Sequence, residues 1–212
     1  MKKFELTTEF ITNFLGTKLF RIKALVEFGK VEKGELGGFV EKEENLDHDG
    51  DAWVSGDAWV SGDAMVYGNA RVYGNAEVYG DAEVYGNAEV YGNARVSGDA
   101  MVYGNARVSG NARVYGNAWV SGNARVSGDA WVSGDQMYAA VKGFGSEYRN
   151  TTFFITKDGN VCVNCGCFSG TLEQFREKVE ETHKDTKYAK EYLMIADLME
   201  MHFKEELEKI KK

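Results

Sequence analysis

The chain has 212 residues and a formal net charge of −8, which disfavours nucleic-acid and membrane-surface partners because acidic surfaces repel polyanions. Its 25 glycines and its lack of proline indicate a repeat architecture with glycine-dependent corners. The sequence has no apolar run near the ~18 residues of a membrane-spanning helix, and the first residues lack the apolar stretch of a signal peptide.

Residues 1–49 are expected to cover the N-terminal end of the repeats that follow. Apolar residues alternate with polar ones from Phe20 to Phe28, which predicts a strand. We interpret Thr7 to Leu15 as a short helix. The glycine-rich segment 34–40 then leads into the first repeat.

A six-residue unit, Asn/Asp-Ala-x-Val-Tyr/Ser-Gly, occurs fourteen times without interruption from Asp51 to Gly134. Three units close a triangular coil in which each unit supplies one short strand and one corner. Valine and alanine point inward, and the residues beside valine point outward. Glycine followed by Asn or Asp suits the corner, since both tolerate left-handed backbone angles. A disordered low-complexity tract is the alternative, but it would lack this buried valine row.

We therefore predict a mainly β fold. Residues 50–135 form a left-handed parallel β-helix of just under five coils, because fourteen units are divided among coils of three. Residues 136–212 follow as a small α+β domain.

A period of 18 residues sorts the outward residues of the repeats into three sides. Two sides carry several charges, whereas the third carries only Glu83. An exposed apolar strip usually marks an interface with another chain. Two alternatives are that the chain's own terminal segments pack over the strip, or that it is a solvent-exposed tyrosine ladder without a function. The predicted interface residues are Met65, Tyr67, Tyr85, Met101, Tyr103 and Trp119.

The charged sides offer a candidate binding site for a phosphate or a nucleotide-like anion. Arginine forks and aromatic stacking would act together there, whereas a solvated charge ladder is the simpler interpretation. The candidate residues are Arg95, Arg107, Arg113, Arg125, Tyr115 and Trp131.

All four tryptophans lie in the first or the last coil. Open ends of a β-helix expose unpaired strand edges that need covers. We therefore expect the tryptophans to pack against the flanking segments: Trp53, Trp59, Trp119 and Trp131.

The C-terminal domain is expected to contain a hairpin and two helices. Strands at 153–156 and 161–165 flank the turn 157–160. Thr171 and Gln174 form a capping box that opens the first helix. The second helix starts near Thr186 and has this apolar face: Tyr188, Tyr192, Ile195, Met199 and Phe203.

Three cysteines crowd into this domain at Cys162, Cys165 and Cys167. An odd number on one short segment is a poor disulfide framework and fits a reducing cytoplasm. Cys165 and Cys167 are weak zinc candidates, together with His183. Strand alternation places Cys162 on the opposite side, so buried, inert thiols are the preferred interpretation and no metal is expected.

The segments 20–24 and 34–40 and the Gly-Asp/Asn-Ala units resemble uncharacterised hexapeptide-repeat proteins of bacteria and phages, which are often labelled as transferases. The segments 165–172 and 187–192 look like tails of the phage members. The resemblance implies the fold, and it makes a homotrimer the first hypothesis for the oligomer. It implies no activity.

Acyltransferases of this fold use a histidine base and a coenzyme A groove between neighbouring coils, usually with a loop that breaks the repeat. This chain has no histidine between His48 and His183 and no such loop. The missing histidines also argue against zinc-dependent carbonic anhydrases, and the absence of threonine between Thr17 and Thr151 argues against ice binding. We assign no catalytic residue and no cofactor.

The sequence thus favours a non-enzymatic, self-associating scaffold or binding protein. A protein that sequesters a small anionic metabolite or nucleotide signal is the first alternative. An acyltransferase-like enzyme whose base lies outside the repeats is the second.

Overall fold

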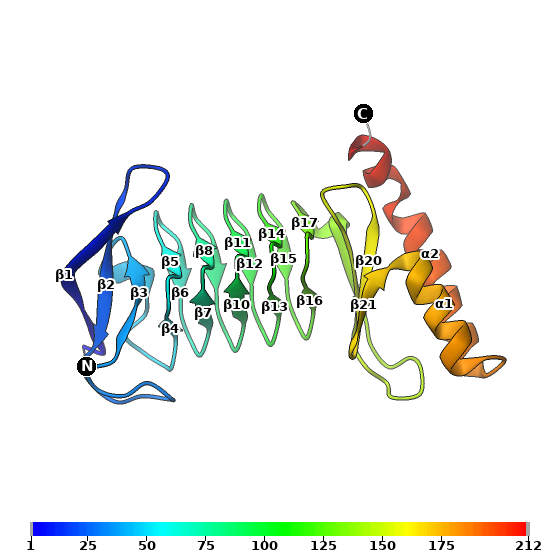
Figure 1. Ribbon diagram of the computed structural model, residues 1–212, viewed down its shortest axis with the longest axis horizontal. Coiled ribbons are helices and arrows are strands. Elements are labelled where there is room, and N and C mark those ends of the chain that lie inside the picture. Colours follow the sequence, from blue (N-terminus) through cyan, green and yellow to red (C-terminus); the bar gives the residue numbers. More distant parts are fainter. Residues whose placement is uncertain (1, 211–212) are drawn as a thin grey trace.

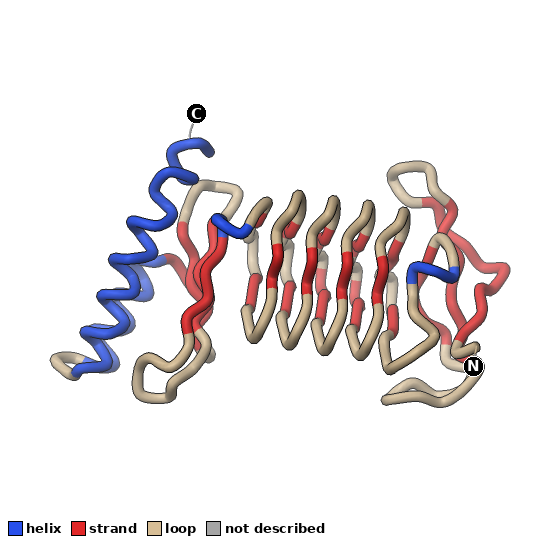
Figure 2. The backbone as a smooth tube through the Cα atoms, turned by 180° about the vertical axis from the view of Figure 1, so that it is seen from behind, coloured by secondary structure: helices blue, strands red, loops and turns tan. Residues whose placement is uncertain are grey.

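A computed structural model describes residues 2–210 of the chain. A column of stacked coils occupies the middle of the molecule, with an antiparallel strand cap at one end (Figure 1). At the other end lie a second sheet and two helices (Figure 2). Among the residues described, none of the helices has the length and apolar character needed to cross a bilayer.

The coils form three parallel sheets, which we name the first, second and third face. The first face contains β4 (Trp53–Val54), β7 (Arg71–Gly74), β10 (Glu89–Gly92), β13 (Arg107–Val108) and β16 (Arg125–Val126). The second contains β5 (Trp59–Val60), β8 (Glu77–Val78), β11 (Arg95–Val96), β14 (Arg113–Val114) and β17 (Trp131–Val132). The third contains β6 (Met65–Val66), β9 (Glu83–Val84), β12 (Met101–Val102) and β15 (Trp119–Val120).

Each strand pairs in parallel with the strand one coil further on. Val72 pairs with Val90 and Val90 with Val108, a step of 18 residues. The predicted parallel β-solenoid is therefore confirmed, with five strands stacked on the first face. Its left-handed sense stays a prediction.

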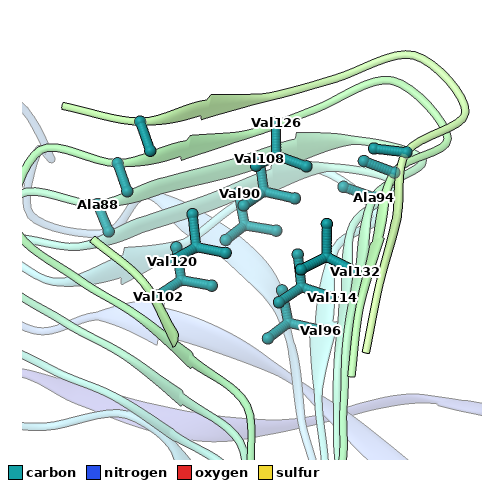
Figure 3. Close-up of a cluster of buried hydrophobic side chains, with 14 of the residues drawn as sticks. Ala88, Val90, Ala94, Val96, Val102, Val108, Val114, Val120, Val126 and Val132 are labelled. Carbon is teal, nitrogen blue, oxygen red and sulfur yellow. The ribbon is translucent and has the colours of Figure 1, made fainter. Parts of the chain in front are cut away.

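Valine and alanine fill the interior of the solenoid, as predicted. The valine columns of the three faces converge on the axis (Figure 3). Val90, Val96 and Val102 each have 0% exposure, as do the alanines beside them. Backbone bonds between coils complete the core, for example from Arg71 N–H to the Ala88 carbonyl at 2.9 Å.

The corners carry columns of polar side chains that the sequence interpretation did not consider. At two corners the Nδ2 of each asparagine donates to the Oδ1 one coil further on, at 3.1 to 3.2 Å. One column runs from Asn69 to Asn123, and the other runs from Asn75 to Asp129. These bonds join the corners of successive coils, in addition to the backbone bonds there, such as the one from Asn69 N–H to the Gly86 carbonyl at 2.7 Å.

The N-terminal cap consists of three strands: β1 (Phe4–Thr12), β2 (Lys18–Ala24) and β3 (Leu36–Val40). β1 and β2 are antiparallel, and β3 pairs in parallel with β5 of the first coil. The cap thus extends the second face, and its buried residues Phe4, Ile22 and Leu46 join the core of the first coil. A short 3-10 helix, η1 (Glu43–Asn45), follows β3.

The predicted helix at Thr7 to Leu15 is wrong. This segment lies in β1 and in the turn after it, where Leu6 pairs with Ile22 and Ile11 with Leu19. Phe10 and Phe14 of this segment are 48% and 63% exposed, so they do not form the buried face that a helix would need. The predicted strand at 20–28 is partly correct, since β2 ends at Ala24, where Gly34 N–H donates to the Ala24 carbonyl.

The tryptophans of the first coil pack against the cap, as predicted. Trp53 is 4% and Trp59 is 7% exposed. Phe4 and Phe28 contact Trp53, and Phe14 contacts Trp59.

The expectation is wrong for Trp119, which is 48% exposed. The C-terminal sheet contacts the backbone of Trp119 through a hydrogen bond from the Tyr138 hydroxyl to its carbonyl, and it does not bury the residue. Trp131 is half-buried.

The C-terminal sheet has four antiparallel strands: β18 (Tyr138–Val141), β19 (Thr151–Ile155), β20 (Val161–Cys165) and β21 (Phe168–Thr171). The predicted hairpin is β19–β20, and the two outer strands were not predicted. A 3-10 helix, η2 (Asp135–Met137), joins the sheet to the last coil.

Two helices cover this sheet, α1 (Leu172–His183) and α2 (Lys187–Ile210). The predicted capping box is confirmed, since Gln174 N–H donates to Thr171 Oγ1 at 3.2 Å and Thr171 N–H to Gln174 Oε1 at 2.9 Å. The predicted apolar face of α2 is buried at four of its five positions: Tyr192, Ile195, Met199 and Phe203.

Candidate functional site

The third face of the solenoid carries a column of stacked tyrosines. The rings of Tyr67 and Tyr85 lie 4.8 Å apart, and those of Tyr85 and Tyr103 lie 5.0 Å apart, with interplanar angles of 4° and 3°. The Tyr67 hydroxyl donates to the Glu83 carboxylate at 2.7 Å. Burial, and then this hydrogen bond, raise the pKa of Tyr67, so the phenol stays neutral. The column is therefore rigid and uncharged apart from Glu83.

The third face is exposed at its two ends and half-buried at the outward residues between them. Met65 at one end is 43% exposed and Trp119 at the other is 48% exposed. Helix α2 lies beyond the C-terminal sheet rather than along the coils (Figures 1 and 2). Within residues 2–210, the chain's own helices therefore do not cover this face.

A groove lies at the C-terminal end of the second face, and we name it the Trp131 groove. In register along the face, Arg95 pairs with Arg113 and Arg113 with Trp131, so the three side chains follow one another coil by coil. The groove has a volume of about 380 Å³ and is lined by Asn93, Arg95, Asn111, Arg113, Asp129, Ala130, Trp131 and Lys157.

The cations of this groove differ in how they are paired. Arg95 lies 2.8 Å from the Glu77 carboxylate. Arg113 has no carboxylate oxygen within 4.0 Å among residues 2–210. Asp129 is the one acid in the lining, and its Oδ1 accepts from Asn111 at 3.1 Å. The groove thus carries a net positive charge beside an indole.

Sequence reasoning missed Lys157 as a groove residue. It lies in the β19–β20 turn, which Thr156 fixes through a β-bridge to Ala130. Lys157 N–H also donates to the Asp129 carbonyl at 3.3 Å. The turn was predicted from the sequence. Its docking on the last coil is a tertiary contact, which a local sequence pattern cannot predict.

The other predicted anion-binding residues are placed elsewhere. Tyr115 lies beside Trp131, with ring centroids 6.1 Å apart, but does not line the groove. Arg107 and Arg125 lie on the first face in a smaller groove of about 190 Å³, next to Cys167.

Both of these arginines already have partners. Arg107 is 3.3 Å from Glu89, and the Arg125 guanidinium donates to the Gly166 carbonyl at 3.2 Å. The candidate residues therefore form two sites, of which only the Trp131 groove has a free arginine.

The expectation of buried thiols is wrong, because Cys162 and Cys165 are half-buried and Cys167 is exposed. Thr151 Oγ1 donates to Cys165 Sγ at 3.2 Å, and the Cys165 thiol donates to the Tyr192 hydroxyl at 3.8 Å. Burial raises the pKa of Cys162, which disfavours the thiolate that a metal or a nucleophilic reaction needs. Across residues 2–210, no three His, Cys, Asp or Glu side chains converge into a metal site.

The two histidines that flank the repeats lie at opposite ends of the molecule. His48 stacks on Phe4 in the cap, with centroids 4.4 Å apart, and His183 lies 5.7 Å from the ring of Tyr192. Neither lines the Trp131 groove, where the side chains can bind an anion and an aromatic ring.

This three-sided stack of parallel coils defines the chain as a β-solenoid repeat protein. The family described as "YdcK Beta solenoid repeat" matches the chain at residues 64–80, 88–104, 94–108, 106–122 and 118–134. The matched segments lie wholly within the repeats. No curated protein matches the sequence.

Proposed function

We propose that this protein is a non-enzymatic scaffold that self-associates through the third face of its solenoid. The observation that supports this proposal most is the uncovered column of stacked tyrosines, with exposed Met65 and Trp119 at its ends. Exposed apolar strips of this kind mark contact surfaces.

Physical properties of the three faces favour the third. Its tyrosines are already ordered by stacking, so association would cost little side-chain entropy. The first and second faces carry arginines and glutamates that would have to be desolvated or paired across an interface. If every copy uses its third face in the same way, the oligomer is closed, and a trimer is the first hypothesis.

Charges placed at the centre of the third face should split the oligomer. The variant is Tyr85→Lys with Met101→Glu, and the expected result by light scattering is a shift to the monomer mass. Circular dichroism should show an unchanged β signal, because outward residues do not contact the valine core.

The matched control is Tyr91→Lys with Arg107→Glu, the equivalent positions on the first face, which should leave the assembly intact. The scaffold proposal fails if the wild type is a monomer at tens of micromolar, or if the third-face variant keeps its assembly.

The Trp131 groove favours a second function, the binding of a small anionic ligand with an aromatic ring, such as a nucleotide. Arg113 and Lys157 would bind the phosphate, and Trp131 would stack on the base. Acyl transfer gains no support from the groove, because neither His48 nor His183 lines it.

Nucleoside phosphates titrated against tryptophan fluorescence test the groove. Arg113→Glu with Lys157→Glu should weaken binding at least tenfold, about 1.4 kcal/mol. Arg107→Glu is the control. Arg107 lies on the first face, where Glu89 already pairs with it, so this change should alter the affinity little. Equal affinities in all three proteins would count against the groove as the binding site.

A further inference from the structure

Helix α2 presents an apolar stripe to solvent on the side away from its buried face. Met194 is 71%, Leu198 49% and Met201 68% exposed. These residues follow one another at helical spacing and lie opposite the buried residues Ala196 and Phe203. A helix that is apolar on two sides has one face that its own fold does not use.

Charged residues extend this stripe in both directions, with opposite signs at the two ends. Lys187 and Lys190 lie in the first turn, and Glu205 and Glu208 lie near the C-terminus. All four are exposed.

This distribution is the reverse of what stabilises an isolated helix, whose dipole favours acids at the N-terminus and bases at the C-terminus. The first turn holds no acidic residue. The last turn does hold the basic Lys209, so the helix dipole leaves unexplained only Lys187, Lys190, Glu205 and Glu208.

We propose that α2 pairs with α2 of a second copy of this chain, antiparallel, through the stripe Met194, Leu198 and Met201. The two-fold axis passes between Asp197 and Leu198. Met194 then lies opposite Met201 of the second copy.

The same register pairs the charges. Lys190 lies opposite Glu205 of the second copy, and Lys187 lies opposite Glu208. Each positive N-terminal end thus meets the negative C-terminal end of the other helix, so the dipoles and the side-chain charges agree.

The pattern points to a second copy rather than to an unrelated partner. Apart from Leu198, whose counterpart in this register is Asp197, the stripe reads the same in both directions once the signs of the charges are exchanged, as a two-fold axis requires of a surface that binds itself. An unrelated partner would not impose that symmetry. The neighbouring helix α1 leaves the stripe free, because Arg176 of α1 contacts Asp197 and Glu200 on its flank.

Charge reversal at each end tests the pairing. Lys187→Glu with Lys190→Glu makes both ends acidic, and Glu205→Lys with Glu208→Lys makes both ends basic. In sedimentation velocity at low salt, each variant alone should self-associate through α2 at least tenfold more weakly than the wild type. A mixture of the two should recover association, and so should the variant with all four changes.

A cysteine introduced at the axis tests the orientation. In a Cys167→Ser background, Leu198→Cys should form a disulfide-linked dimer under mild oxidation, because Leu198 of both copies lies near the axis. Lys187→Cys should not crosslink with itself, because it faces Glu208 of the second copy.

Every outcome distinguishes this pairing from association through the third face. If Tyr85→Lys with Met101→Glu abolishes all association and the helix variants change nothing, the α2 proposal is overturned. It is also overturned if the mixture of acidic and basic variants fails to recover association, or if Lys187→Cys crosslinks as efficiently as Leu198→Cys. Recovery in the mixture together with crosslinking at Leu198 alone supports the pairing.

Discussion

Val90→Asp is expected to unfold the protein. The Val90 side chain is 0% exposed and is surrounded by valine and alanine columns that contain no polar partner (Figure 3). An unpaired carboxylate there costs several kcal/mol, comparable with the ~5–15 kcal/mol that holds a typical domain together. Thermal unfolding followed by circular dichroism should show no cooperative transition, or a melting temperature lowered by tens of degrees.

Two controls separate the charge from the loss of packing. Val90→Ala removes two methyl groups and should cost about 1–3 kcal/mol, leaving a cooperative transition. Tyr91→Asp places the same carboxylate on the outer surface and should leave the solenoid folded. A soluble Val90→Asp protein with the wild-type melting temperature would contradict the buried valine core.

Gly110→Ala is expected to be the second most damaging of these substitutions. Gly110 has φ of +69°, and a Cβ there would lie 2.9 Å from the backbone nitrogen of Gly128 in the next coil. The left-handed conformation costs about 1–2 kcal/mol for a residue with a side chain, and relief of the contact costs about 1–3 kcal/mol more.

Gly128→Ala is the matched control, because Gly128 has nearly the same φ of +66° but nothing within 4 Å of the added Cβ. It should show the conformational cost alone. For a chain of this size, the extra loss at Gly110 corresponds to a melting temperature lower by about 2–12 °C. Equal losses at the two positions would show that coils do not restrict the corners of their neighbours.

The repeat allowed the solenoid to be predicted from the sequence because the information is local and redundant. Valine, alanine and glycine recur at fixed places, and one geometry satisfies all of them. The N-terminal helix was misjudged for the opposite reason. Residues 7–12 lie in β1, which pairs with β2, and this pairing is a contact with another part of the chain that the segment itself does not reveal.

The candidate site was predictable only as far as the repeat extends. The period of 18 residues placed Arg95, Arg113 and Trp131 on one face, and the structure aligns them there. Two features depend on how the C-terminal sheet docks on the last coil. Lys157 reaches the Trp131 groove, and Arg125 donates a hydrogen bond to the Gly166 carbonyl and so is not free to bind an anion. That docking involves non-local contacts that leave no periodic trace in the sequence.

The unit of six residues is smaller than the coil of three units, and this difference restricts how the molecule can change length. Excision of residues 87–104 would remove one whole turn, shorten the rod by ~4.8 Å, and leave every column and both ends in their present orientation. Excision of a single unit would instead swivel the C-terminal sheet and α2 by a third of a turn relative to the cap. Each later residue would also move to the neighbouring face or corner. Asparagines would then stack on aspartates, and tyrosines of the third face would stack on residues of a charged face. Only the removal or addition of whole coils therefore changes the length of the solenoid without rotating one end relative to the other.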